Sequence, residues 1–320
     1  MNDSSTEPCR LRLILASVLL LSFVYGEAYP QELTIGSSTT SSIKAQRMTQ
    51  RIKSVALSLH FELPELGLTY RRCLEYAKQL GASHVAIVVQ AQMTETTSST
   101  LSTQGGESTS MTELKRVIGL AEELSLKVIL FPIIWLDQRG EGEWRGTLAP
   151  RDLNRWWISY EEWITTLAVL AEKHKVSMLS IGSELSSLES DEGRWRAMIR
   201  RLRSSYSGLM TYSANWDHFD QVGFWDQLDM IGLTAYYPLA TPQSILRKRE
   251  RSSSHSKPRL RVNSMRSRWS LVRLGLIEWL EKHHPQRSIF FTELGYPSQV
   301  GGAEKPWHYL QSAEVDLDIQ

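Results

Sequence analysis

Short apolar runs alternate with amphipathic stretches along most of the chain. The apolar runs are brief, and several are flanked by Gly, Pro or polar residues, as the buried strands of parallel sheets are. They are Val55–Leu59, His84–Val89, Val128–Ile134, Met178–Ile181, Leu209–Ser213, Met230–Ala235 and Ile289–Thr292. We therefore predict seven parallel strands.

The stretches between these runs have helical spacing, with apolar residues on one side and charged residues on the other. The predicted helices are Tyr70–Leu80, Met111–Leu124, Leu153–Lys173, Arg194–Tyr206 and Trp269–His284. Strands that alternate with helices indicate βαβ units. A doubly wound open sheet is the alternative, but the sequence has no Gly-rich phosphate loop to mark its ligand site.

The chain length suits one (β/α)₈ barrel, which typically needs about 250 residues. Seven predicted strands are one fewer than a closed barrel requires. After Glu293 there is room for a loop and one helix beginning near Ser312, but not for an eighth strand with its helix. We predict an α/β protein with a TIM-type barrel over residues 53–320 that is incomplete at its C-terminus.

The N-terminus has the features of a secretory signal. Arg10 and Arg12 precede an apolar run, Leu13–Tyr25, which is followed by small and polar residues. We predict a signal peptide over residues 1–28, a flexible leader over 29–52, and a secreted or periplasmic protein. An uncleaved membrane anchor is the alternative. Cys9 falls in this signal, so Cys73 has no disulfide partner in the mature chain.

Charge is balanced overall but not locally. With 36 basic and 35 acidic residues, no global field attracts nucleic acid or an anionic membrane. Arg247–Arg268 is strongly basic, and we predict a solvated, poorly ordered loop there, with an anionic surface or partner as the functional alternative.

Thr94–Ser110 is rich in Ser, Thr, Gly and Gln, and we predict a mobile loop on the substrate face.

Two glutamates follow predicted strands directly. Glu184 comes after Met178–Ile181, and Glu293 comes after Ile289–Thr292. Active sites of (β/α)₈ enzymes lie at the carboxyl ends of the strands. A carboxylate pair facing each other there is what glycoside hydrolysis requires. The alternative is that each glutamate pairs with a nearby Arg or caps a helix.

A series of motifs resembles glycoside hydrolase family 113, and the resemblance runs in order from about Val55 to Trp307. The motifs are Gly142–Gly146, Trp156–Tyr160, Ile181–Leu185, Leu209–Trp216, Phe224–Asp226, Leu228–Gly232, Tyr236–Leu239 and Phe291–Tyr296. The family belongs to a clan of retaining (β/α)₈ hydrolases, and its members include β-1,4-mannanases. The resemblance therefore implies hydrolysis of a β-linked polysaccharide or oligosaccharide.

By this resemblance Glu184 is the acid/base and Glu293 the nucleophile. Tyr236 matches the tyrosine that hydrogen-bonds the nucleophile in the clan; the alternative is a rim aromatic with its hydroxyl in solvent. Ser183 stands where many members have Asn, whose amide contacts the sugar 2-hydroxyl. Serine cannot span the same distance, so Asn215 or another rim amide could substitute.

Aromatic side chains near strand ends are the remaining candidates for substrate binding. Trp144, Trp216 and Trp307 could line sugar subsites, or could pack in the core or at the rim. His60 and Glu62 could contact a sugar hydroxyl or lie on the plain surface. We find no metal-binding spacing and predict no cofactor, no nucleic-acid partner, no stable membrane insertion after signal cleavage, and a monomer. A catalytically inactive carbohydrate-binding barrel is the rival function.

Overall fold

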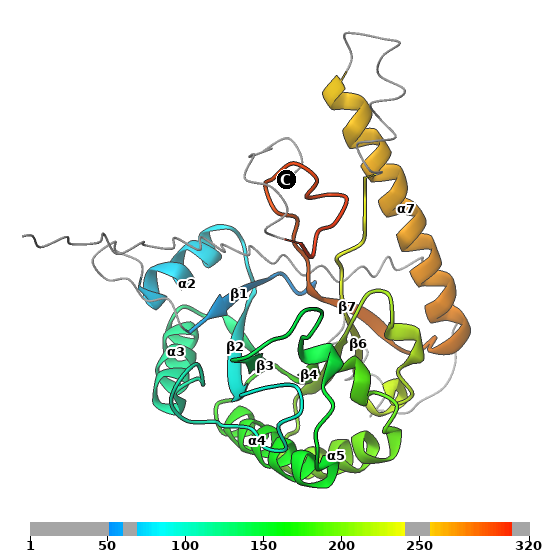
Figure 1. Cartoon of the computed structure of the whole chain (residues 1–320). Coiled ribbons are helices and arrows are strands. Elements are labelled where there is room, and N and C mark those ends of the chain that lie inside the picture. The colour runs from blue at the N-terminus through cyan, green and yellow to red at the C-terminus, as the bar shows by residue number, and fades with distance from the viewer. Residues whose placement is uncertain (1–50, 60–68, 241–256, 309–320) are drawn as a thin grey trace, which may run out of the picture.

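Seven parallel strands form one sheet that curls into a half-barrel, with helices between the strands on its outer side (Figure 1). The computed structural model describes residues 51–59, 69–240 and 257–308, with side chains from residue 264 onward in the last helix. The strands are β1 (Ser54–Ser58), β2 (His84–Met93), β3 (Lys127–Leu136), β4 (Met178–Ser183), β5 (Leu209–Ala214), β6 (Met230–Thr234) and β7 (Ser288–Glu293). They lie in sequence order, and β1 and β7 form the two edges of the described sheet. The predicted incomplete TIM-type barrel is confirmed.

The helices cover the convex face of the sheet. They are α2 (Tyr70–Gln79), α3 (Met111–Glu123), α4 (Leu153–Lys173), α5 (Glu192–Ser205) and α7 (Lys257–His283). The side chains of Thr69, Ser110 and Asp152 accept hydrogen bonds from backbone N–H groups in the first turns of α2, α3 and α4. These caps satisfy donors that have no partner within the helix, so they define where each helix begins.

Two apolar layers follow from the alternation of side chains along the strands. The larger layer lies between the strands and the helices, and it includes a group of packed aromatic rings on α4 and α5. In this group Trp157 and Trp195 are 5.0 Å apart, and Trp156 stacks on Tyr160 at 4.8 Å. The smaller layer lies inside the curl and consists of Ile52, Ala86, Ile129, Met178, Met230 and Phe290. Several tryptophans are therefore core residues rather than ligand-binding residues.

Helix α7 corrects one prediction. Arg247–Arg268 was predicted to be a poorly ordered loop, but residues 257–268 form the first half of α7. Lys and Arg are good helix formers, and Met265, Trp269 and Val272 pack against the core at helical spacing. The charges therefore mark the solvated side of a helix. Residues 247–256 lie outside the described residues.

Several other predictions also fall outside the described residues. These are the signal peptide, most of the leader, His60, Glu62 and the helix near Ser312. No helix in the described segments is both long and apolar enough to cross a bilayer.

The segment Thr94–Ser110 folds back on β2, because Gln92 and Ser102 exchange both backbone hydrogen bonds. Its Leu101 N–H also donates to the Ser159 hydroxyl of α4.

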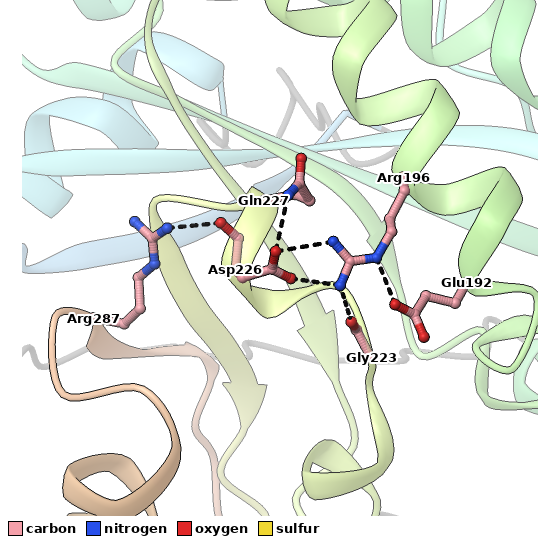
Figure 2. Close-up of polar contacts among 6 residues, drawn as sticks. All are labelled: Glu192, Arg196, Gly223, Asp226, Gln227 and Arg287. Carbon is pink, nitrogen blue, oxygen red and sulfur yellow. Dashed lines mark hydrogen bonds and ion pairs between the residues drawn. The ribbon is translucent and has the colours of Figure 1, made fainter.

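The connection from β5 to β6 has no α-helix, only two single 3₁₀ turns, Phe219–Gln221 and Trp225–Gln227. Polar contacts fix it to α5 instead (Figure 2). The Arg196 guanidinium donates to both carboxylate oxygens of Asp226, at 2.7 and 2.9 Å, and to the Gly223 carbonyl at 2.7 Å. Arg287, just before β7, donates to the Asp226 carbonyl at 2.8 Å. One aspartate thus joins α5, this connection and the start of β7.

Candidate active site

Glu184 stands at the end of β4 in an unusual backbone conformation. The pairing of β4 with β5 shifts register between Ser180 and Ser183, as a β-bulge does. Glu184 then adopts φ of 54°, in the left-handed region that non-glycine residues rarely occupy. Its N–H donates to the Ser213 carbonyl at 2.7 Å. The bulge and the left-handed residue together turn the Glu184 side chain toward the carboxyl ends of the strands.

Glu293 ends β7, and two hydroxyl groups contact its carboxylate. The Tyr236 hydroxyl donates to Oε2 at 2.8 Å, and the Ser183 hydroxyl lies 3.5 Å from Oε1. Only 9% of Glu293 and 6% of Glu184 are exposed. The Tyr236 hydroxyl therefore binds the carboxylate and does not point to solvent. Ser183 at the end of β4, Tyr236 after β6 and Glu293 at the end of β7 meet at one place.

Arg145 brings a positive charge to this pair. It begins a single 3₁₀ turn, Arg145–Thr147, after β3, and its guanidinium forms an ion pair with Glu184. Burial opposes the charge of Arg145, but Glu184 and Glu293 outweigh it and raise its pKa. Pairing with an Arg was the alternative considered for each glutamate, and for Glu184 this contact exists. Arg145 was not predicted as a site residue, because it does not directly follow an apolar run. It does lie inside the family motif Gly142–Gly146.

The two glutamates experience different surroundings. Burial raises the pKa of Glu184 to about 7, Arg145 lowers it, and nearby Glu293 raises it again. Burial and a neighbouring negative charge both disfavour the ionised form, so they outweigh the arginine. Glu293 accepts a hydrogen bond from Tyr236. The arrangement can therefore hold a proton on Glu184 near neutral pH.

Behind Glu184 lies a third buried carboxylate, which the sequence analysis did not single out. Glu189 is 2% exposed; it accepts from the Tyr212 hydroxyl at 2.7 Å and contacts His218 Nδ1 at 2.8 Å. The Tyr212 hydroxyl in turn accepts from the Leu185 N–H at 2.8 Å. This chain of contacts holds the backbone next to Glu184.

The other predicted residues divide between the site and local packing. Trp216 stacks on Trp307 with ring centroids 5.9 Å apart, and Trp307 is 47% exposed, so this pair offers an aromatic surface. The amide of Asn215 donates to the Ser186 hydroxyl at 3.0 Å. The ring of Trp144 lies so close over Gly146 that a Cβ there would approach it to 2.3 Å. Trp144 therefore packs on its own turn.

Metal-binding chemistry has no support among the residues that the structure describes. They contain no group of three His, Cys, Asp or Glu side chains placed to hold an ion. His218 is paired with Glu189.

Comparison with known proteins fits this geometry. The sequence profile of Glycoside Hydrolase Family 113 matches residues 69–320. The chain belongs to this family. Glycoside hydrolases of family 113 are also among its structural neighbours. One is the β-mannanase AaManA from Alicyclobacillus acidocaldarius in complex with ManMIm, with 26% identity and a TM-score of 0.66, covering 83% of this chain and 77% of that chain.

A second neighbour supports the fold. It is a family 113 β-1,4-mannanase solved as a complex, with 24% identity and a TM-score of 0.60, covering 78% of this chain and 73% of that chain. No curated protein matched the sequence. The family 113 membership predicted from the ordered motifs is therefore confirmed.

Proposed function

We propose that this chain is a retaining glycoside hydrolase that cleaves β-linked polysaccharide or oligosaccharide, with β-1,4-mannan as its substrate. Family 113 membership supports glycoside hydrolysis, and the similarity to a β-mannanase supports mannan. The observation that carries the mechanism is the buried pair Glu184 and Glu293, with Tyr236 bound to Glu293 and Arg145 bound to Glu184.

The first step needs a nucleophile and an acid. The Glu293 carboxylate, held by the Tyr236 hydroxyl, attacks the anomeric carbon and forms a glycosyl ester while the bond to the leaving oxygen breaks. Glu184 donates its proton to that oxygen. Its pKa of about 7 keeps a large share of the carboxyl groups protonated at neutral pH.

The second step reverses the role of Glu184. Once the proton has gone, the carboxylate takes a proton from water, and the resulting nucleophile attacks the anomeric carbon and releases Glu293. Arg145 stabilises the ionised form of Glu184 between the two steps, because its guanidinium is already in contact with the carboxylate. Two displacements leave the anomeric configuration unchanged.

Release of reducing ends tests the proposal. Mannan, glucomannan, xylan and cellulose are incubated with the parent chain and with Glu293→Gln. We expect the parent chain, but not Glu293→Gln, to release reducing ends from mannan. Proton NMR of the first product should show the β-anomer. Release from no polymer by a folded parent, or an α-anomer as first product, contradicts the proposal.

An inactive carbohydrate-binding barrel is the second candidate, and it is favoured by the absence of any pairing between β1 and β7 within the described residues. Binding of manno-oligosaccharide to the parent without any product would select it. The retained pair Glu184 and Glu293 favours the enzyme.

We also propose that the chain is exported as a monomer. The basic, apolar and small-residue pattern of residues 1–28 supports a signal peptide. Expression of the full chain followed by N-terminal sequencing and light scattering tests this. A mature protein that starts near residue 29 and has the mass of one chain is expected, whereas an intact N-terminus in the membrane fraction contradicts export.

A further inference from the structure

The concave face of β2 and β3 carries an aromatic residue that the catalytic arrangement does not use. The register of β2 and β3 runs without interruption from His84 and Lys127 to Met93 and Leu136, so side chains alternate regularly along both strands. Ile129 belongs to the inner apolar layer, whereas Leu136 packs on the outer side. Trp135 therefore lies on the inner side of β3.

Trp135 lies near the same end of the sheet as Glu184. Leu130 of β3 pairs with Leu179 of β4. Trp135 is the last residue but one of β3, and Glu184 directly follows β4. Trp135 is thus one strand away from Glu184, at the carboxyl ends of the strands.

The ring of Trp135 is open to solvent. It is 37% exposed, whereas Trp156, Trp195 and Trp225 are almost completely buried. The guanidinium carbon of Arg139 lies over the ring, 5.4 Å from its centre, and brings hydrogen-bond donors close to it. Because Arg139 takes one face of the ring, a pyranose stacks with its apolar face on the opposite one.

Gln90 supplies a second, independent observation. It lies on the inner side of β2, two residues before Gln92, whose register partner is Trp135. Gln90 is 9% exposed, and its Oε1 has no hydrogen-bond partner in the described parts of the chain. Gln92, by contrast, donates to Asp137 and accepts from the Glu107 N–H at 3.2 Å. A buried acceptor without a partner is costly, so its presence calls for a reason.

We propose that Trp135, Gln90 and Arg139 form a further sugar subsite on the β2–β3 side of the active site. The Trp135 ring stacks on a pyranose ring, Gln90 Oε1 accepts from a sugar hydroxyl, and Arg139 donates to another. The ligand is a neutral β-linked oligosaccharide that extends past the cleaved bond. This subsite rests on the proposed function and deepens it, because it makes affinity depend on substrate length.

The test measures affinity against length. The full chain carrying Glu293→Gln is titrated calorimetrically with β-1,4-manno-oligosaccharides of two to six units. Adding Trp135→Ala should weaken binding of the longest oligomers by about tenfold and leave the disaccharide unchanged. Trp135→Phe should restore most of the loss, and the unchanged affinity for the disaccharide excludes a folding defect. Tyr76→Ala removes a ring that is 58% exposed on α2 and should bind like its parent.

Gln90→Leu separates a ligand contact from a structural one. Because the unpartnered oxygen is removed, we expect an unchanged or higher Tm together with severalfold weaker binding of long oligomers. A lower Tm with unchanged affinity overturns the role of Gln90. Equal affinities of Trp135→Ala and its parent at every length, while the wild-type chain still hydrolyses mannan, overturn the subsite alone. Absence of both binding and hydrolysis overturns the proposed function with it.

Discussion

Arg145 and Glu184 form an ion pair between the turn that follows β3 and the residue that follows β4. Only the amino-terminal halves of these strands pair, at Ile129 with Met178 and Leu130 with Leu179. Beyond these pairs, Arg145 and the hydrogen bond from the Ser187 hydroxyl to the Leu148 carbonyl, at 2.7 Å, join the connections that follow the two strands. Arg145 also sets the charge at the site, because two buried carboxylates share one guanidinium.

The ion pair should control the alkaline limb of the pH–rate profile. Arg145 lowers the pKa of Glu184, so Arg145→Met should raise this pKa above about 7 and shift the fall of kcat/KM to higher pH. In the variant, Glu184 then stays protonated at pH values where Glu184 of the parent chain is already ionised. The pH dependence of kcat/KM on a soluble oligosaccharide measures this. An alkaline limb that stays in place or moves to lower pH contradicts the assignment of Glu184 as the acid.

Leaving-group dependence tests the same residue independently. Glu184→Gln should lose activity most severely on substrates with poor leaving groups, because these need a proton in the first step. Aryl glycosides with a good leaving group should retain far more activity. Rates on a series of aryl glycosides give the comparison. Equal losses across the series would contradict the assignment of Glu184 as the acid.

Glu184 should also make stability depend on pH. Its pKa is raised from an ordinary value of 4.5 to about 7 in the fold, so the folded state binds more protons than the unfolded state between these values. Stability from this group is complete below about pH 4.5 and is lost as pH rises through about 7, by up to about 3 kcal/mol. Urea unfolding at pH 5 and pH 8 should show a smaller decline for Glu184→Gln than for the parent. The unpaired Arg145 costs the variant stability at both pH values, so the difference between them isolates Glu184.

The buried chain behind Glu184 should affect turnover more than binding. Tyr212→Phe removes the hydroxyl that joins the Leu185 N–H to Glu189, and leaves both without that partner. We expect a loss of about 1–3 kcal/mol in stability and a fall in kcat of about tenfold with little change in KM. Steady-state kinetics measured well below Tm give kcat and KM separately. A change confined to Tm would mean that the chain is structural only.

The contacts of Figure 2 provide a contrast, because they involve neither Glu184, Glu293 nor Arg145. Arg196→Met removes the paired hydrogen bonds to Asp226, whose pKa Arg196 holds down to about 2. Asp226 is 51% exposed, so solvent screening limits the loss to about 1 kcal/mol. Tm should fall modestly while kcat and KM stay constant. A large loss of activity would show that the β5–β6 connection positions the site.

The strand pattern made much of this architecture predictable, because burial on both faces produces short apolar runs whose last residues define one end of the sheet. Glu184 and Glu293 could be found for that reason. Arg145 and Glu189 could not, since nothing in a loop sequence reveals which carboxylate or hydroxyl it will contact. The start of α7 was missed because its charges outnumber the apolar residues that pack. Trp135 lies one residue beyond the predicted strand Val128–Ile134, and its inward direction depends on the register of β3, which extends to Leu136.

The conformation of Glu184 has a consequence for protein engineering. A left-handed residue with a side chain costs about 1–3 kcal/mol that glycine would not, and Glu184 also carries a buried carboxyl group. Glu184→Gly relieves that strain, but it leaves the buried Arg145 guanidinium without its carboxylate partner, which costs more. The melting temperature should therefore fall, and an engineer who wants to remove the strain must replace Arg145 in the same variant.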